Sequence, residues 1–103
     1  MVLVISIAYP LGSKFDMDYY LKHHMPLVQK VWASHGLKSW KVAQYTNSDS
    51  PFAVQAWLEW EDGASWDAAS TVPDAKEIFA DIPNFSDHGP VRLAGSVTGS
   101  ASW

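Results

Sequence analysis

The sequence predicts an α+β fold built on one antiparallel sheet. Three observations support it: Val2–Tyr9 is an uncharged strand pattern, Phe15–His35 is a long amphipathic helix pattern, and the remainder continues as strand, strand, helix, strand. This βαββαβ order is typical of a ferredoxin-like sandwich, with four antiparallel strands and helices on one face of the sheet. At 103 residues, the chain is expected to be a single domain, residues 1–103.

The first strand, Val2–Tyr9, is predicted to be central because it carries no charge and both of its faces are largely apolar. Ile5 and Tyr9 share one face, while Val4 and Ala8 share the other. The helices of this fold cover only one face, so a second copy of the chain is expected to cover the other, giving a homodimer packed sheet to sheet. The alternative is an exposed weak apolar patch, and large patches of this kind are uncommon on monomers.

The turn Pro10–Lys14 leads into Phe15–His35, which is predicted to be one helix with His24 on its buried face. Asp16 is expected to cap this helix and Gly36 to end it. Because Pro26 removes one backbone N–H, we expect a kink near His24 and Met25. At 100° per residue, the predicted buried face contains Met17, Tyr20, Leu21, His24, Leu27, Val28, Val31, Trp32 and His35.

The rest of the chain supplies a hairpin, a broken helix and a final strand. The strand after Gly36 carries two lysines, which suits an edge position, and a turn-forming stretch joins it to its partner. Asp62 is expected to cap a second helix that Pro73 interrupts. The predicted ranges are Leu37–Tyr45 and Phe52–Trp60 for the strands, Asp74–Ile82 for the further helical turn, Pro83–Pro90 for a loop, Val91–Thr98 for the last strand and Gly99–Trp103 for a tail.

Composition and motif content exclude several classes of protein. The net charge of −4 and seven scattered basic residues argue against nucleic-acid binding. The absence of cysteine excludes disulfides and thiol catalysis. Neither a signal-peptide pattern nor a membrane-length apolar run is present, so a soluble cytoplasmic protein is expected, with no membrane partner. The hydrophobic content of 48%, with six tryptophans, is more than a small monomer easily buries, which again favours a homodimer.

Two stretches of the sequence carry a family resemblance. They are Phe15, Tyr19 and Tyr20 with His24-Met25-Pro26-Leu27-Val28, and Ile82–Asp87 followed by Pro90-Val91. They are similar to the signature of the EthD family in the dimeric α+β barrel superfamily, and the resemblance covers nearly the whole chain. It implies a ferredoxin-like protomer, a homodimer and a cleft between sheet and helices. Superfamily relatives include cofactor-free monooxygenases, polyketide cyclases and dehydratases, lactone isomerases and haem-degrading enzymes, so the fold alone does not select a reaction.

His24 is the leading catalytic candidate. An imidazole in an apolar cleft has its pKa lowered by desolvation and stays neutral near pH 7, so it could take a proton from an acidic carbon or a phenol. Tyr20, one turn earlier on the same face, could orient the imidazole or bind a substrate oxygen, and His88 on the loop is the second histidine to test. The alternative is a structural core histidine bonded to a strand carbonyl, Gln44 or Gln55.

The candidate substrate-binding residues are largely aromatic, and their alternative role is packing in the core or at the dimer interface. They are Trp40, Gln55, Trp57, Trp66, Phe79 and Phe85. No metal site is expected. His23 and His24 are adjacent and diverge on a helix, His24 and His35 are about 16 Å apart by helical rise, and no HExxH motif is present.

These observations leave three hypotheses of function. The first is a cofactor-free lyase, cyclase or monooxygenase-type enzyme that acts on a small apolar compound, aromatic or polyketide-like, with His24 as general base. The second is a ligand-binding or accessory protein of a degradation pathway, without turnover. The third is a haem-binding protein, with His24 beside the haem. Turnover of a candidate ligand separates the first two, and a hemin Soret shift lost on replacing His24 would support the third.

Overall fold

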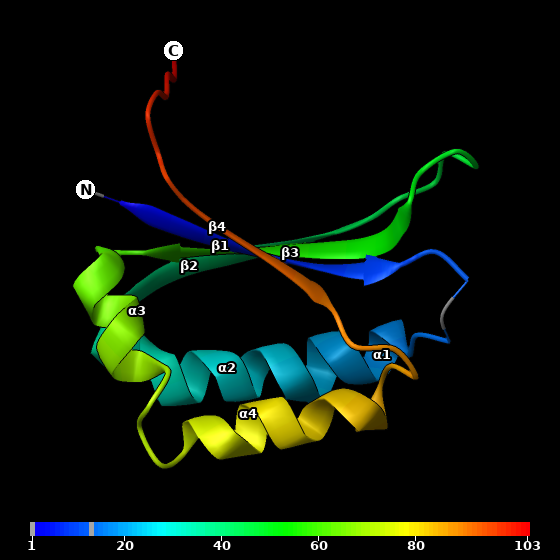
Figure 1. Ribbon diagram of the computed structural model, residues 1–103, viewed down its shortest axis with the longest axis horizontal. Helices are drawn as coiled ribbons and strands as arrows, with labels where there is room; N and C mark the ends of the chain where they lie inside the picture. The colour runs from blue at the N-terminus through cyan, green and yellow to red at the C-terminus, as the bar shows by residue number, and fades with distance from the viewer. Residues whose placement is uncertain (1, 13) are drawn as a thin grey trace.

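The computed structural model describes residues 2–12 and 14–103, so Ser13, in the predicted turn Pro10–Lys14, lies outside the described residues. Four strands form one antiparallel sheet in the order β2-β3-β1-β4. The helices cover one face of this sheet and leave the other face open (Figure 1). The βαββαβ order and the ferredoxin-like sheet confirm the predicted fold. The strands are β1 (Leu3–Pro10), β2 (Leu37–Gln44), β3 (Phe52–Trp60) and β4 (Val91–Ser96).

The central position predicted for the first strand is confirmed, because β1 pairs with β3 on one side and β4 on the other. Its residues alternate between the two faces of the sheet. Ile5 and Tyr9 are buried under the helices, whereas Val4 lies on the open face and is only partly buried. The edge position predicted for the lysine-bearing strand is also confirmed, since β2 stands at one end of the strand order and pairs with β3.

The first helical segment begins and ends where the sequence predicts. The Asp16 carboxylate accepts a hydrogen bond from the Tyr19 N–H at 3.0 Å, which caps the first turn. Gly36 ends the segment with a positive φ of 104°, and its position also leaves no room for a Cβ, which would meet Ser65 at 2.6 Å. The segment consists of α1 (Met17–Tyr19), a π-helical turn (Tyr20–His24), α2 (Met25–Trp32) and a 3-10 turn (Ala33–His35).

The π-helical turn is the main departure from the prediction. The Met25 N–H bonds to the Tyr20 carbonyl, so this turn holds one residue more than an α-helical turn. Pro26 then falls at the start of α2, where its missing N–H costs least. The additional residue rotates the buried face, so Met25 becomes buried. Leu21 is 42% exposed and His35 is exposed, so their predicted burial is wrong.

The second helical segment is broken at Pro73, as predicted, into α3 (Gly63–Ala69) and α4 (Ala75–Asp81). Asp62 caps α3 by accepting a hydrogen bond from the Ser65 N–H at 2.8 Å. A 3-10 turn, Ile82–Asn84, follows α4, and the chain then forms an isolated bridge between Phe15 and Ser86. This bridge ties the predicted loop to the start of the first helical segment.

Aromatic side chains fill both ends of the space between sheet and helices. Tyr9, Phe15, Tyr20 and Phe85 contact one another at one end, with ring centroids 4.8–5.9 Å apart. Trp32, Trp60 and Trp66 pack edge to face at the other end. None of the helices in the described part of the chain is long and apolar enough to cross a membrane.

Candidate active site

A cavity of about 300 Å³ lies between the sheet and the helices, and its lining is mainly apolar. This volume is at the lower end of the range typical of small-molecule sites, about 300–1,000 Å³. Its exposed lining residues are Phe79 on α4 and Arg92 on β4, so its mouth lies between these two elements. The buried part of the lining is Ile5, Tyr9, Tyr20, His24, Met25, Val28, Trp32, Leu58 and Ile78.

His24 lies on the inner wall of this cavity and is 5% exposed. Its Nδ1 is 3.0 Å from Oδ2 of Asp81, the last residue of α4. Asp81 is itself held in place, because its Oδ1 accepts hydrogen bonds from the Tyr19 hydroxyl at 2.6 Å and from the Asn84 amide at 2.9 Å. The π-helical turn and the C-terminal end of α4 therefore meet in a His–Asp pair.

Electrostatics decides which nitrogen of His24 carries the proton. Burial lowers the pKa of His24 and outweighs the opposite effect of the Asp81 hydrogen bond and charge. Burial alone would raise the pKa of Asp81, but its three hydrogen bonds hold that pKa below its usual value. A carboxylate can only accept, so Nδ1 must donate. Nε2 is then an acceptor, and no group within residues 2–12 and 14–103 is hydrogen-bonded to it.

Two tyrosines of the lining carry hydroxyls that can donate a hydrogen bond. Tyr9 and Tyr20 both line it, and neither hydroxyl has a hydrogen-bond partner among the residues that the structure describes. Burial raises the pKa of both phenols, so both stay protonated at neutral pH. The Tyr20 ring stacks on the His24 ring at 5.3 Å and 14°, and Phe85 contacts the same imidazole at 4.5 Å. These two ring contacts fix the orientation of the imidazole ring.

The structure brings several predicted site residues together at the cavity. His24, Tyr20, Trp66 and Phe79 line it directly, and Phe85 packs behind the imidazole without lining the cavity. The remaining predicted residues lie elsewhere.

Gln55 and Trp57 lie on the open face of the sheet, which corrects their predicted placement in the cleft. Val54, Ala56 and Leu58 are buried against the helices, so the residues between them point the other way. Gln55 instead accepts a hydrogen bond from the Tyr45 hydroxyl at 2.5 Å. The side-chain partner of His24 is therefore Asp81, rather than either glutamine considered from the sequence.

Trp40 and His88 are also outside the cavity. The Trp40 indole N–H donates to Gln29 of α2 at 3.1 Å, which ties the edge strand β2 to the helix. His88 is exposed, and its Nδ1 lies 2.8 Å from Oδ1 of Asp87. Neither residue contributes to the cavity lining.

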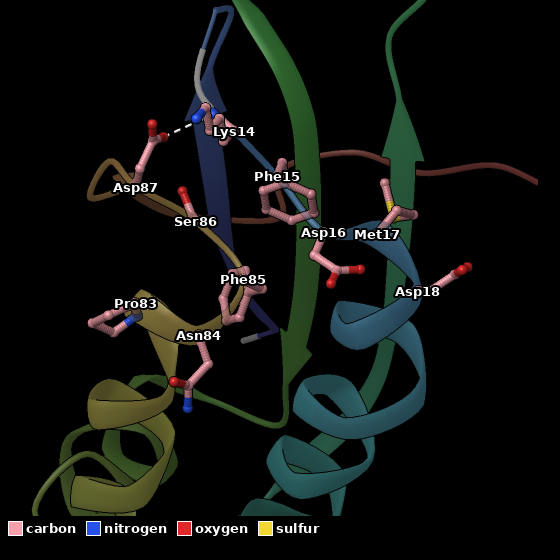
Figure 2. Close-up of a pocket in the computed structure, with 10 residues that line it drawn as sticks. All are labelled: Lys14, Phe15, Asp16, Met17, Asp18, Pro83, Asn84, Phe85, Ser86 and Asp87. Atoms are coloured by element: carbon pink, nitrogen blue, oxygen red, sulfur yellow. Dashed lines mark hydrogen bonds between the residues drawn. The ribbon is translucent and has the colours of Figure 1, made fainter.

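A second, wider pocket of about 680 Å³ is lined in part by Phe15 and Phe85, two of the four rings that meet at one end of the space between sheet and helices. Figure 2 shows its two walls, the segments 14–18 and 83–87, with the hydrogen bond from the Lys14 N–H to Asp87 at 2.8 Å. His24 does not line this pocket. In the described part of the chain, no group of three or more histidine, cysteine or acidic residues could hold a metal ion.

Sequence reasoning missed Asp81, Tyr9 and Arg92 as site residues. Asp81 follows Ile78 by three positions, so it shares the inner side of the predicted turn Asp74–Ile82. A carboxylate on that inner side could have identified Asp81 as a site residue from the sequence. Tyr9 was grouped correctly with Ile5 on one face of the strand, but it was not considered as a site residue. The pairing between α4 and the π-helical turn arises from tertiary packing, which periodicity does not reveal.

The chain is similar in structure to several solved proteins. No family model matches the chain, and no curated protein does. An EthD-like protein from Ralstonia eutropha JMP134 superposes with a TM-score of 0.84 at 25% identity, covering 98% of this chain and 96% of that one. An EthD family protein from Bacillus halodurans C-125 gives 0.72 at 22% identity, covering 95% and 99%. A dimeric ferredoxin-like protein from Jannaschia sp. CCS1 gives 0.67 at 13% identity, covering 93% and 98%.

Proposed function

We propose that this chain, an EthD-like protein by its structural neighbours and its sequence signature, binds a small apolar compound and removes a proton from it. His24 acts as the general base. The observation that carries this proposal is the His24–Asp81 pair at 3.0 Å, which leaves Nε2 as an unpaired acceptor on the wall of an apolar cavity. A base in a low-dielectric site with a fixed tautomer is suited to proton abstraction.

The proposed step is removal of a proton from a carbon next to a carbonyl group. Nε2 of His24 takes the proton, the C–H electron pair forms the enolate double bond, and the carbonyl oxygen becomes negative. Tyr9 and Tyr20 both line the cavity, and their hydroxyls donate hydrogen bonds to that oxygen. Donors fixed where charge develops stabilise the transition state more than the ground state. Enolate formation of this kind begins both cyclisation and dehydration of polyketide-like compounds.

Asp81 acts through His24 rather than on the substrate, because it does not line the cavity. Its hydrogen bond keeps the proton on Nδ1 before the reaction, and its charge stabilises the imidazolium that forms when Nε2 takes the substrate proton. Tyr19 and Asn84 keep the carboxylate oriented and ionised.

We also propose that two copies of the chain associate through the open faces of their sheets. This face carries the exposed apolar side chains Val91 and Leu93, which are 44% and 51% exposed, together with the partly buried Val4 and Trp57. Such a surface normally needs a partner. The Jannaschia neighbour is described as dimeric.

The function can be tested with 2-tetralone, a two-ring ketone with an enolisable position. In heavy water near neutral pH, the wild-type protein should accelerate exchange of the ketone α-protons over a protein-free control, as measured by loss of their NMR signal. Acceleration that saturates with ketone concentration would indicate turnover inside the cavity. Saturable binding without any acceleration would instead support the ligand-binding hypothesis and remove the catalytic one.

A further inference from the structure

Arg92 is the feature of the cavity that the proposed chemistry does not use. It lies on β4 opposite Ile7 of β1, and both residues line the cavity. Strand alternation fixes its direction, because its neighbours Val91 and Leu93 belong to the open face. The guanidinium lies over the Trp66 ring, 5.7 Å from the ring centroid. This cation–π contact holds the guanidinium at the mouth of the cavity.

Arg92 also forms no ion pair with any acidic residue that the structure describes. The ion pairs of the described residues both involve histidines, His24 with Asp81 and His88 with Asp87, although the chain has eleven acidic residues. Because His24 is neutral, Arg92 is the one charged side chain among the described residues of the cavity lining. An arginine at the mouth of an apolar cavity is therefore available to a ligand.

We propose that the ligand of this cavity is a carboxylate with an apolar ring body, and that Arg92 binds the carboxylate at the mouth. This inference rests on the proposed function, since it concerns the same cavity. The guanidinium fork matches a carboxylate with two parallel hydrogen bonds. The ring body occupies the apolar interior between Trp32, Trp66 and Ile78, which directs the far end of the ligand to His24.

The chemistry of the mouth favours a carboxylate over a phosphate ester. A phosphate commonly carries close to two negative charges and needs several donors around its oxygens. The exposed part of the lining consists of Arg92 and Phe79, and the Arg92 guanidinium lies over the ring of Trp66. A single planar guanidinium with an aromatic ring next to it suits a ligand that carries a single planar carboxylate on an aromatic ring system.

The test compares two probes of nearly equal shape, 2-naphthoate and 2-naphthamide, by calorimetric titration at about pH 7.5, where only the first is charged. The wild-type protein should bind 2-naphthoate about tenfold more tightly than the amide. In Arg92→Gln the preference should disappear, with the amide affinity unchanged, and Arg92→Lys should keep part of it. Lys38→Gln removes an exposed cation on β2, far from the mouth, and should leave the preference intact.

The outcomes separate this inference from the proposed function. Equal affinity of the two probes in the wild-type protein, or a preference that survives Arg92→Gln, would overturn the role of Arg92 while leaving an apolar binding cavity. If neither probe binds, the proposed function fails and this inference fails with it. Arg92 is exposed, so its variants should fold, and unchanged melting curves would verify this.

Discussion

Replacing His24 with asparagine should slow the protein-catalysed exchange of 2-tetralone α-protons by about 10²-fold or more. Asparagine cannot take a proton at neutral pH, so the cavity would lose its base. The shape of the cavity and its tyrosine donors would remain. Its amide can still donate to Asp81, so the unfolding free energy should change little. The exchange rate, measured by NMR, should therefore fall, whereas the melting curve, measured by circular dichroism, should change little.

His23→Asn is the matched control for this experiment. His23 is the neighbouring residue on the same π-helical turn, but it is exposed and does not line the cavity. It should alter neither the exchange rate nor the melting curve. If His24→Asn instead loses roughly 1–3 kcal/mol of stability and its residual activity follows only the folded fraction, then His24 is a structural core residue.

An aspartate placed on either face of β1 should be disruptive, but in different ways. Ile5 is 1% exposed beneath the helices, so Ile5→Asp buries a carboxyl group without a partner and should unfold the protein, at a cost of about 3–5 kcal/mol. Val4 lies on the open face opposite Glu59 of β3, so Val4→Asp should place like charges in the proposed dimer interface. It should give a folded monomer.

Light scattering and circular dichroism distinguish these outcomes. The wild-type protein at micromolar concentration should show twice the chain mass of 11.4 kDa, and Val4→Asp should show the chain mass with its circular dichroism spectrum retained. Ile5→Val, which removes only one methylene, should remain folded and dimeric, with a loss of about 0.5–1.5 kcal/mol. A Val4→Asp protein that remains dimeric would exclude the open face as the interface.

The fold was predictable because its signals are local. The uncharged strand Val2–Tyr9, the cap at Asp16, the stop at Gly36 and the break at Pro73 each depend on residues close in sequence. Together they give the element order, and that order leaves few possible sheet topologies.

The candidate site was predictable only in part, because its geometry depends on packing between distant segments. The periodicity of the helix correctly placed Tyr20 and His24 inside, but a uniform period cannot contain the π-helical turn, which exposes Leu21 and buries Met25. Asp81 is 57 residues from His24, and no spacing rule connects them. For the same reason Gln55 was considered as a partner, although β3 directs it to the opposite face.

In the proposed function, neutral His24 is oriented by Asp81 and is the base that faces the cavity. The most direct test is the pH dependence of 2-tetralone exchange, measured together with an NMR titration of the His24 ring. Burial lowers the His24 pKa below the ordinary value of a histidine, so the rate should rise with pH and level off. Its midpoint should lie below that ordinary value and coincide with the His24 titration.

Asp81→Asn supplies the control for this profile, because it removes a charge and alters a hydrogen bond that both raise the His24 pKa. In this variant both midpoints should move together to lower pH, and the plateau rate should fall. In both proteins, the exchange rate and the His24 ring titration should follow one midpoint. A rate that does not change across the His24 titration, or a midpoint that Asp81→Asn leaves in place, would contradict it.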